Sequence, residues 1–320
     1  MSSDQLSPLV ADLHLLTVLA DTRSFTETAR RLGVSKASAS MRITELERAA
    51  GVNLVRRTTR SVGLTEAGQQ LVNEMQPAFS RISQSYTAVR DLVGTPRGLI
   101  RLTAPVALGR QHLAPRVAEF LKLFPGIRIE LELTDRFVNL ANEGFDLAIR
   151  HTSTVPETHV AWVLCDTRSV LLASSDYLAR RGKPAHPSEL AAHDCLLYLG
   201  GHTSNWTFAR QSKRKAAGNE KVGVPINGLL KANNSEVLRD ALLAGLGIGL
   251  LPDFSVSALP AGERQRLVQI LPDWQAQGFF GDHIYALRPW SAQVPKAVQC
   301  LVTHLRAGFA AGFPLPEHLV

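Results

Sequence analysis

Residues 35–40 read SKASAS, a run of three serines and two alanines around one lysine. At the start of a helix, such small side chains would let the helix axis lie close to a large surface. Their hydroxyl groups could exchange hydrogen bonds with it, and the free N–H groups of a first helical turn suit a phosphate. These residue types predict contact with the major groove of DNA. A three-helix core in an unrelated protein, with a serine-rich cap, is the alternative.

The expected contacts follow from the side-chain types. Serine hydroxyls can bond to base edges, and the methyl group of an alanine can touch that of a thymine. Lysine and arginine can reach guanine or phosphate. The candidate DNA-contacting residues of this helix and of the helix before it are Ser24, Thr26, Ser35, Lys36, Ala37, Ser38, Ser40, Met41 and Arg42.

Positive charge is concentrated around this run. Between Arg30 and Arg60, eight basic residues stand against two acidic ones, a balance of +6 in a chain whose net charge is +7. Residues 56–65, RRTTRSVGLT, combine β-favouring threonine and valine with a glycine, which predicts a two-stranded wing with arginines at its tip. The candidate DNA contacts of this wing are Arg56, Arg57, Thr58 and Arg60.

Three helices would hold these groups in place. The second begins at Ser24, where Glu27 completes a capping box, and ends at Gly33. The third begins at Ser35 and ends at Gly51, with an apolar stripe formed by Ala39, Ile43, Leu46 and Ala50. Two helices joined by a tight glycine turn form a helix-turn-helix.

A long helix is predicted next, from Thr65 to about Leu92. Its apolar residues recur at three- and four-residue steps, close to a heptad, so we expect it to pair with a second copy of the chain. Pro77 removes a helical hydrogen bond and predicts a kink or a break. Residues 94–98, GTPRG, have the composition of a hinge.

The remainder of the chain alternates strands and helices, as in a parallel α/β sheet with covered faces. Strands are expected at residues 99–104, 127–134, 145–150, 169–174, 195–200, 247–252 and 283–289. Helices are expected at residues 105–123, 137–144, 187–192, 235–246 and 295–309. The charged run 210–221 is interpreted as a solvated loop.

A ligand at such a sheet lies at the carboxyl ends of the strands, where helices begin. In LTAPV, Thr103 ends a strand and Pro105 opens a helix, so the hydroxyl and the following N–H groups could hold a carboxylate; an ordinary helix cap is the alternative. Arg150 and His151 end another strand and could face the same cleft, a surface salt bridge being the alternative. The loop 200–206 is expected on the opposite wall, with Asn233, just before a helix cap at Ser235, as a weaker candidate. The full candidate set is Thr103, Ala104, Pro105, Val106, Arg136, Phe137, Arg150, His151, His202, Thr203, Trp206 and Asn233.

Residues 25–68 resemble the N-terminal domain of LysR-type transcriptional regulators. The motifs that carry the resemblance are Phe25-Thr26-Glu27-Thr28-Ala29, Ser35…Ser40…Leu46-Glu47 and Arg57-Thr58-Thr59-Arg60…Leu64-Thr65-Glu66-Ala67-Gly68. Downstream, EGFDLAIR (143–150) and AGLGIGLLP (244–252) resemble the effector-binding half of the same family. Thr28, Lys36, Met41 and Val55 depart from the residues common in the family, so the operator sequence is not expected to carry over.

The resemblance implies a particular domain organisation. An all-α winged helix-turn-helix would occupy residues 1–64 and a linker and dimerisation helix residues 65–94. An effector-binding domain, 95–310, would consist of two α/β subdomains similar to periplasmic binding proteins, followed by a tail, 311–320. Subdomain I would comprise residues 95–165 and 268–310, and subdomain II residues 166–267.

The function implied is that of a ligand-responsive regulator. It would bind double-stranded promoter DNA and a small organic, anionic effector, and would form a dimer through the linker helix and then a homotetramer. RNA polymerase is a further expected partner. No cofactor, metal or membrane partner is expected.

The remaining features exclude several classes of protein. Three widely spaced cysteines without a CxxC pair argue against a disulfide framework and a structural zinc site. The N-terminus lacks a signal-peptide pattern, and the longest apolar run, 241–252, is too short to span a bilayer, so a cytoplasmic protein is expected. We expect no enzyme, because the nucleotide-binding, hydrolase and metalloprotease motifs are missing. A solute-binding protein of a transporter and a nucleoid-structuring DNA-binding protein are the alternatives.

Overall fold

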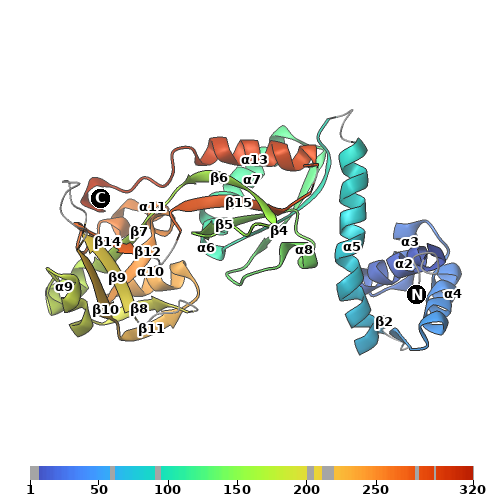
Figure 1. Cartoon of the computed structure of the whole chain (residues 1–320), viewed down its shortest axis with the longest axis horizontal. Helices are drawn as coiled ribbons and strands as arrows, with labels where there is room; N and C mark the ends of the chain where they lie inside the picture. The colour runs from blue at the N-terminus through green and yellow to red at the C-terminus, as the bar shows by residue number, and fades with distance from the viewer. Residues whose placement is uncertain are drawn as a thin grey trace. The chain divides into compact units, whose positions relative to one another are not determined.

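The computed structural model describes residues 7–57, 62–90, 95–199, 205–210, 220–277, 281–291 and 293–319 (Figure 1). The chain divides into two units, one formed by residues 1–92 together with 141–144, the other by residues 93–140 and 145–320. The first consists mainly of helices and the second of helices and sheets. In the described part of the chain, none of the helices combines the length and the apolar character that a bilayer crossing requires.

The N-terminal unit begins with the short helix η1 (Ser7–Leu9), followed by α2 (Val10–Thr22), α3 (Phe25–Leu32) and α4 (Lys36–Ala50). The predicted caps of α3 and α4 are confirmed. Ser24 Oγ accepts a hydrogen bond from the Glu27 N–H at 3.3 Å, and Ser35 Oγ accepts one from the Ser38 N–H at 3.0 Å. Gly33 and Gly51 end the two helices with φ of 68° and 71°, a left-handed conformation that suits glycine.

Two details of this unit differ from the prediction. The stripe of α4 buries Ala39, Ile43 and Leu46, but Ala50, at the last turn, is exposed. The carboxylate of Glu27 is bound by the guanidinium groups of Arg30 and Arg31, an arrangement that a capping box does not predict.

The predicted wing consists of β1 (Val55–Arg57) and β2 (Val62–Leu64), which pair antiparallel. Glu47 Oε1 fixes its first strand to α4 by accepting hydrogen bonds of 2.9 Å from the N–H groups of Leu54 and Val55. At Gly68, an added Cβ would lie 2.0 Å from the carbonyl oxygen of Leu54. The close approach of α5 to the start of the wing therefore requires a glycine at this position.

The helix α5 (Glu66–Arg90) continues through Pro77, so the predicted break is absent. We also expected the apolar side chains of this helix to be covered by a second copy of the chain, but those of its first half are covered by the N-terminal unit itself. Leu71, Met75 and Phe79 pack against the core of α2, α3 and α4, and Val72 is buried there. Only further along the helix are large apolar side chains exposed, Ile82 to 61% and Tyr86 to 67%.

The second unit contains two five-stranded sheets, which define two subdomains. The sheet of subdomain I has the order β4-β3-β5-β15-β6. Its strands are β3 (Gly98–Ala104), β4 (Ile127–Leu133), β5 (Leu147–Thr152), β6 (His159–Asp166) and β15 (His283–Pro289). β3 runs parallel to β4 and β5, whereas β15 runs antiparallel to its two neighbours.

Helices cover this sheet. The predicted helix 105–123 is present as α6 (Val106–Leu108), a five-residue π-helical stretch (Gly109–Leu113) and α7 (Ala114–Leu123). The predicted helix 137–144 is reduced to α8 (Leu140–Glu143), and the closing helix is α13 (Lys296–Phe309). Phe120, Leu301 and Leu305 are among the buried residues of the core between helices and sheet.

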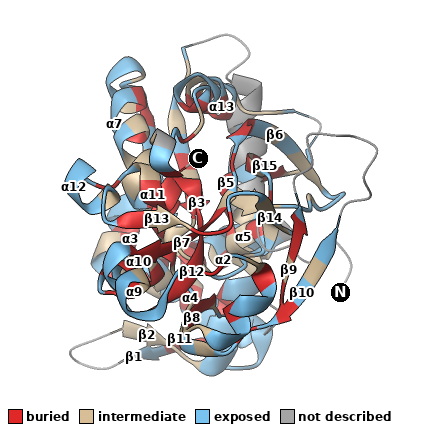
Figure 2. Cartoon of the chain, turned by 90° about the vertical axis from the view of Figure 1, so that its left-hand side faces the viewer, coloured by how far each residue is buried: buried red, intermediate tan, exposed pale blue. Residues whose placement is uncertain are grey.

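Subdomain II has a five-stranded sheet of order β11-β8-β12-β7-β13 and a three-stranded sheet of order β10-β9-β14. Figure 2 shows the central strands β7 and β12 as buried. The strands are β7 (Ser169–Ser174), β8 (Cys195–Tyr198), β9 (Asn205–Arg210), β10 (Lys221–Pro225), β11 (Gly228–Ala232), β12 (Ile248–Pro252), β13 (Leu267–Gln269) and β14 (Trp274–Gln277). The helices are α9 (Ser175–Arg181), η4 (Pro187–Ala192), α10 (Ser235–Leu243), α11 (Asp253–Ser257), α12 (Ala261–Arg264) and η5 (Glu317–Leu319).

The subdomain boundaries differ from the predicted ones at the C-terminal end. β13 and β14 belong to the sheets of subdomain II, so the chain returns to subdomain I after Gln277, later than residue 268. The segment predicted as a tail packs on both subdomains. Phe313 is buried in the core of subdomain I, whereas Leu319 is buried in subdomain II.

Candidate nucleic-acid interface and ligand cleft

The outer face of α4 presents the residues predicted to contact DNA. Ser35, Lys36 and Ala37 are exposed at its first turn, and Met41 follows one turn later with 57% of its surface exposed. Ser38 and Ser40 are half-buried. Because the hydroxyl oxygen of Ser35 accepts the cap bond, its proton remains available to donate to a phosphate. The helix therefore offers one cation, small polar groups and an apolar thioether to a groove.

Arg42 does not belong to this face. Its guanidinium Nε donates to Asp12 Oδ1 of α2, and the two side chains are only 24% and 14% exposed. The pair joins α4 to α2 inside the domain. The prediction that Arg42 reaches DNA is therefore replaced by a structural role.

The start of α3 adds Thr26, which is exposed, and Ser24, whose hydroxyl oxygen accepts the cap bond. Beside them, Glu27 lies 2.7 Å from the guanidinium of Arg30. Hydrogen bonding to Arg30 lowers the pKa of Glu27 to about 2. Glu27 therefore stays ionised at neutral pH and cancels one of the two positive charges of Arg30 and Arg31.

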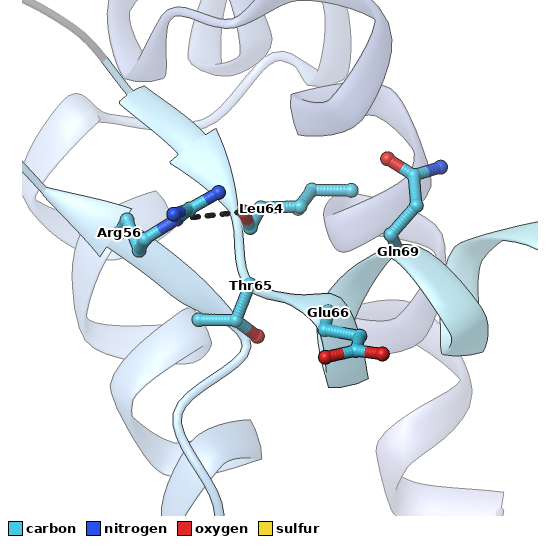
Figure 3. A pocket seen from close by; sticks show the side chains of 5 residues that line it. All are labelled: Arg56, Leu64, Thr65, Glu66 and Gln69. Carbon is cyan, nitrogen blue, oxygen red and sulfur yellow. Dashed lines mark hydrogen bonds between the residues drawn. The ribbon is translucent and has the colours of Figure 1, made fainter.

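At the base of the wing, Arg56 Nε donates a 3.1 Å hydrogen bond to the carbonyl of Leu64 on the partner strand (Figure 3). The residue borders a hollow that is also lined by Leu64, Thr65, Glu66 and Gln69 (Figure 3). The bond keeps the guanidinium beside the wing. The side chain of Arg57 and the residues Thr58 and Arg60 lie outside the described part of the chain.

In the second unit, the end of β3 forms the floor of the predicted cleft. Thr103 is fully buried, and its hydroxyl oxygen accepts a 3.3 Å hydrogen bond from the guanidinium of Arg150 on β5. Ala104 is buried and Pro105 half-buried. The structure thus brings Thr103 and Arg150 together, as predicted.

The N–H group of Val106, predicted to bind a ligand carboxylate, is already bonded within the protein. It donates a 3.0 Å hydrogen bond to Asp135 Oδ1, at the turn that follows β4. Asp135 Oδ2 accepts a second bond, of 2.9 Å, from the side-chain amide of Asn234. Asp135 was missed in the sequence, although the rule that places ligands at strand ends also applies to β4, which lies directly beside β3.

His151 points away from this floor. Its ring Nε2 bonds to the carbonyl oxygen of Gly281 at 2.6 Å, and its ring lies edge-on to Phe254 at 5.6 Å. Burial lowers the pKa of His151 to about 4. At neutral pH the ring is uncharged and donates to a carbonyl, so it serves the fold and not an anionic ligand.

The other candidate effector-binding residues do not gather around Thr103 and Arg150. Trp206 is buried in the core of subdomain II and is not exposed at a wall. Arg136 and Phe137 are exposed, Phe137 to 95%. Asn233 is exposed, and its neighbour Asn234, not Ser235, caps α10 by accepting from the N–H groups of Glu236 and Val237. His202 and Thr203 lie outside the described residues.

Comparisons with known proteins give a consistent result. Residues 10–69 match the model described as bacterial regulatory helix-turn-helix protein, lysR family, and residues 94–310 match the model of the LysR substrate binding domain. The chain is 34% identical over 300 residues to the HTH-type transcriptional regulator PtxR of Pseudomonas aeruginosa, covering 92% of this chain and 91% of that one. It is 31% identical over 267 residues to the HTH-type transcriptional activator TtdR of Escherichia coli, covering 83% and 84%.

Solved structures are similar along most of the chain. The full-length Vibrio cholerae virulence activator AphB has a TM-score of 0.60 and 26% identity, with 93% of this chain and 98% of that chain covered. CrgA from Neisseria meningitidis has a TM-score of 0.53 and 27% identity, with 93% and 96% covered. The helix-turn-helix match and the regulator relatives disfavour a transporter solute-binding protein and a nucleoid-structuring protein.

Proposed function

Since the chain belongs to the LysR family of transcriptional regulators, we propose that it binds promoter DNA through α3, α4 and the wing. The observation that carries this proposal is the outer face of α4. Its first turn is capped by Ser35 and exposes Lys36 and Ala37, while the opposite face packs into the helical core. Small side chains at a helix start let the backbone approach the groove closely.

The proposed DNA contacts are of two kinds. Base edges are contacted by Ala37, Ser38, Ser40 and Met41. Phosphates are contacted by Ser35 and Lys36 at the first turn of α4, by the start of α3 and by the wing. The wing and α3 contribute Ser24, Thr26, Arg56, Arg57, Thr58 and Arg60. Met41 has no hydrogen-bond donor, so it would favour the thymine methyl group where an arginine would favour guanine.

A salt titration with Lys36→Ala tests this interface. The variant should bind promoter DNA more weakly, with a slope of log affinity against log salt reduced by about 1 for the lost phosphate contact. Lys122→Ala, on the exposed surface of α7, is the matched control and should bind as the parent does. An unchanged affinity and slope for Lys36→Ala would remove this helix start from the interface.

We also propose that the cleft of the second unit binds a small organic effector that is anionic or hydroxylated. The support is the pair formed by Thr103 and Arg150 at the carboxyl ends of two parallel strands. A thermal-shift screen of small carboxylates and aromatics tests it, because a ligand that binds only the folded state raises its melting temperature. Loss of the shift in Thr103→Val would place the ligand at this pair.

Self-association and cellular partners complete the proposal. The exposed apolar residues Ile82 and Tyr86 support pairing of α5 with α5 of a second copy, and two such dimers would form a tetramer. RNA polymerase is the proposed partner at the promoter, and the cytoplasm, where bacterial promoters lie, the proposed location.

A further inference from the structure

Asp135 joins two helix starts that belong to different subdomains. One carboxylate oxygen accepts from the backbone N–H of Val106, the first residue of α6, at 3.0 Å. The other accepts from the side-chain amide of Asn234, the N-cap of α10, at 2.9 Å. Asp135 and Val106 belong to subdomain I and Asn234 to subdomain II, so this carboxylate links the two subdomains.

The orientation of Asn234 is fixed by the helix that it caps. Its Oδ1 accepts hydrogen bonds from the N–H groups of Glu236 at 2.9 Å and Val237 at 3.3 Å. The amide therefore presents Nδ2 to the cleft, and only an acceptor can bind there. Asp135 supplies an acceptor to both subdomains at once, which an ionised carboxylate can do with its two oxygens.

A second contact links the two subdomains at the same helix. Gln111, in the π-helical stretch of subdomain I, donates a 2.9 Å hydrogen bond to Glu236 of α10. Arg110 approaches the same carboxylate at 3.9 Å. Glu236 lies two residues after Asn234, so both contacts engage the first turn of α10 and pull it towards α6.

We propose that Asp135 is a built-in latch, which holds the two subdomains together across the cleft when no effector is bound. The inference rests on the proposed function of that cleft as the effector site. The two donors that Asp135 binds, a backbone N–H and a side-chain amide, are groups that would also bind the carboxylate of an acidic effector. Asp135 therefore occupies these donors with the same chemical group that such an effector would carry. Breaking the latch opens the cleft without a ligand.

Exchanging the two latch residues tests this idea with conservative variants. In Asp135→Asn, the amide has a single acceptor oxygen facing two donors, so one of the two bonds is lost without a change of shape. In Asn234→Asp, the new carboxylate still caps α10 but faces the carboxylate of Asp135 and repels it.

The double variant should restore the bridge. The amide at position 135 would accept from the N–H of Val106 and donate to the carboxylate at position 234, whose other oxygen caps α10. The net charge of the pair is the same as in the parent. Rescue by this exchange separates a latch from a general loss of folding, which a second substitution would not repair.

The readout is the distance between the two subdomains in the full chain without ligand. Spin labels are attached at Glu132→Cys on β4 and Lys231→Cys on β11, both exposed and each three residues before a latch residue. Cys300, the one partly exposed cysteine among the three, is replaced by serine. Double electron–electron resonance then gives the distribution of distances across the cleft.

In each single variant we expect the ratio of the open to the closed population to rise about tenfold or more, since a hydrogen bond to a charged group is lost. The double variant should return the ratio to that of the parent. Unchanged distributions in both single variants, or a double variant that stays open, would overturn the latch. The thermal-shift screen of the parent is run separately, so a failure of the proposed effector site appears there and not in these distances.

Discussion

At the scale of single residues, two arginines of the basic N-terminal stretch form bonds within the protein itself. Arg42 lies six residues after Lys36 on α4, yet its guanidinium is directed inward to Asp12 of α2. Arg56 lies at the base of the wing and bonds to a backbone carbonyl. Counting positive charges in the sequence therefore overstates the number that can face DNA.

We predict that Arg42→Ala destabilises the domain and leaves the salt dependence of DNA binding unchanged. Removing one partner of a largely buried, charge-assisted pair should cost about 1–3 kcal/mol. Thermal unfolding of the full chain measures the loss, and a salt titration measures the slope. A normal melting temperature with a reduced slope would return Arg42 to the DNA interface.

His151 gives a prediction about pH. Burial lowers its pKa from 6.5 to about 4, so the folded state disfavours the charged ring. Its contribution to stability is complete above the unfolded pKa and is lost as the pH falls from about 6.5 towards 4. The shift corresponds to at most about 3 kcal/mol.

His151→Gln keeps a donor for the Gly281 carbonyl but cannot be protonated. Between pH 7 and pH 4.5 it should lose less stability than the parent, as measured by urea unfolding at both pH values. The buried Asp253, whose pKa burial raises to about 6, acts in the opposite sense, because its stability contribution falls as the pH rises through that range. Since Asp253 is present in both chains, it cancels from the difference. Equal acid sensitivity of the two chains would contradict the assignment to His151.

At the scale of elements, α5 is used in two ways along its length. Its first half packs on the core of its own unit through Leu71, Val72 and Met75, whereas Ile82 and Tyr86, one turn apart, are exposed. A dimer contact is therefore expected only on the second half of the helix.

We predict that Ile82→Asp combined with Tyr86→Asp breaks the pairing of α5 and gives a smaller assembly than the parent in sedimentation, because two charges cannot be buried unpaired in an apolar contact. Ser83→Asp, at an exposed position on the adjoining face of the same helix, is the control and should assemble as the parent does. A double variant that sediments as the parent does would place the main contact elsewhere.

Periodicity predicted the strands with strong apolar patterns and missed several others, most of them at sheet edges. The buried strands β3, β7, β12 and β15 were all expected from their runs of branched and apolar residues. β10, KVGVP, was missed because glycine and proline disfavour a strand. It lies at the edge of the three-stranded sheet, where a proline needs no partner.

The candidate functional sites were predicted where they depend on local sequence and missed where they depend on contacts between distant residues. Caps such as Ser24 and Ser35 depend on local sequence and were predicted, as was the pair of Thr103 and Arg150 at strand ends. Asp135 and Asn234 are 99 residues apart, and their contact depends on how two subdomains close. The burial of Trp206 likewise depends on the pairing of β9 with β10 and β14, which no local pattern indicated.

At the scale of the whole second unit, the C-terminal segment fastens one subdomain to the other. Phe313 is buried against α13 in subdomain I, and Leu319 is fully buried beside β13 in subdomain II. Leu319, in the short helix η5, therefore contributes to the core of a subdomain whose first strand begins 150 residues earlier in the chain, at Ser169.

Leu319→Ala should lower the free energy of unfolding by about 2–3 kcal/mol, the cost of a large cavity in a core. Pro314→Ala, at an exposed position of the same segment, is the control and should change it little. Urea unfolding of both variants measures the difference. Equal stabilities would show that this segment does not support subdomain II.

The three passages between the subdomains also restrict the motion that the cleft can make. The chain crosses from β6 to β7, returns from β14 to β15, and crosses again between Phe313 and Leu319. A body attached to another at two neighbouring strands can both bend and twist about them. A third attachment, at the end of α13, resists torsion and leaves bending as the softer movement. Opening of this cleft is therefore expected to be a hinge-bending motion and not a twisting of one subdomain against the other.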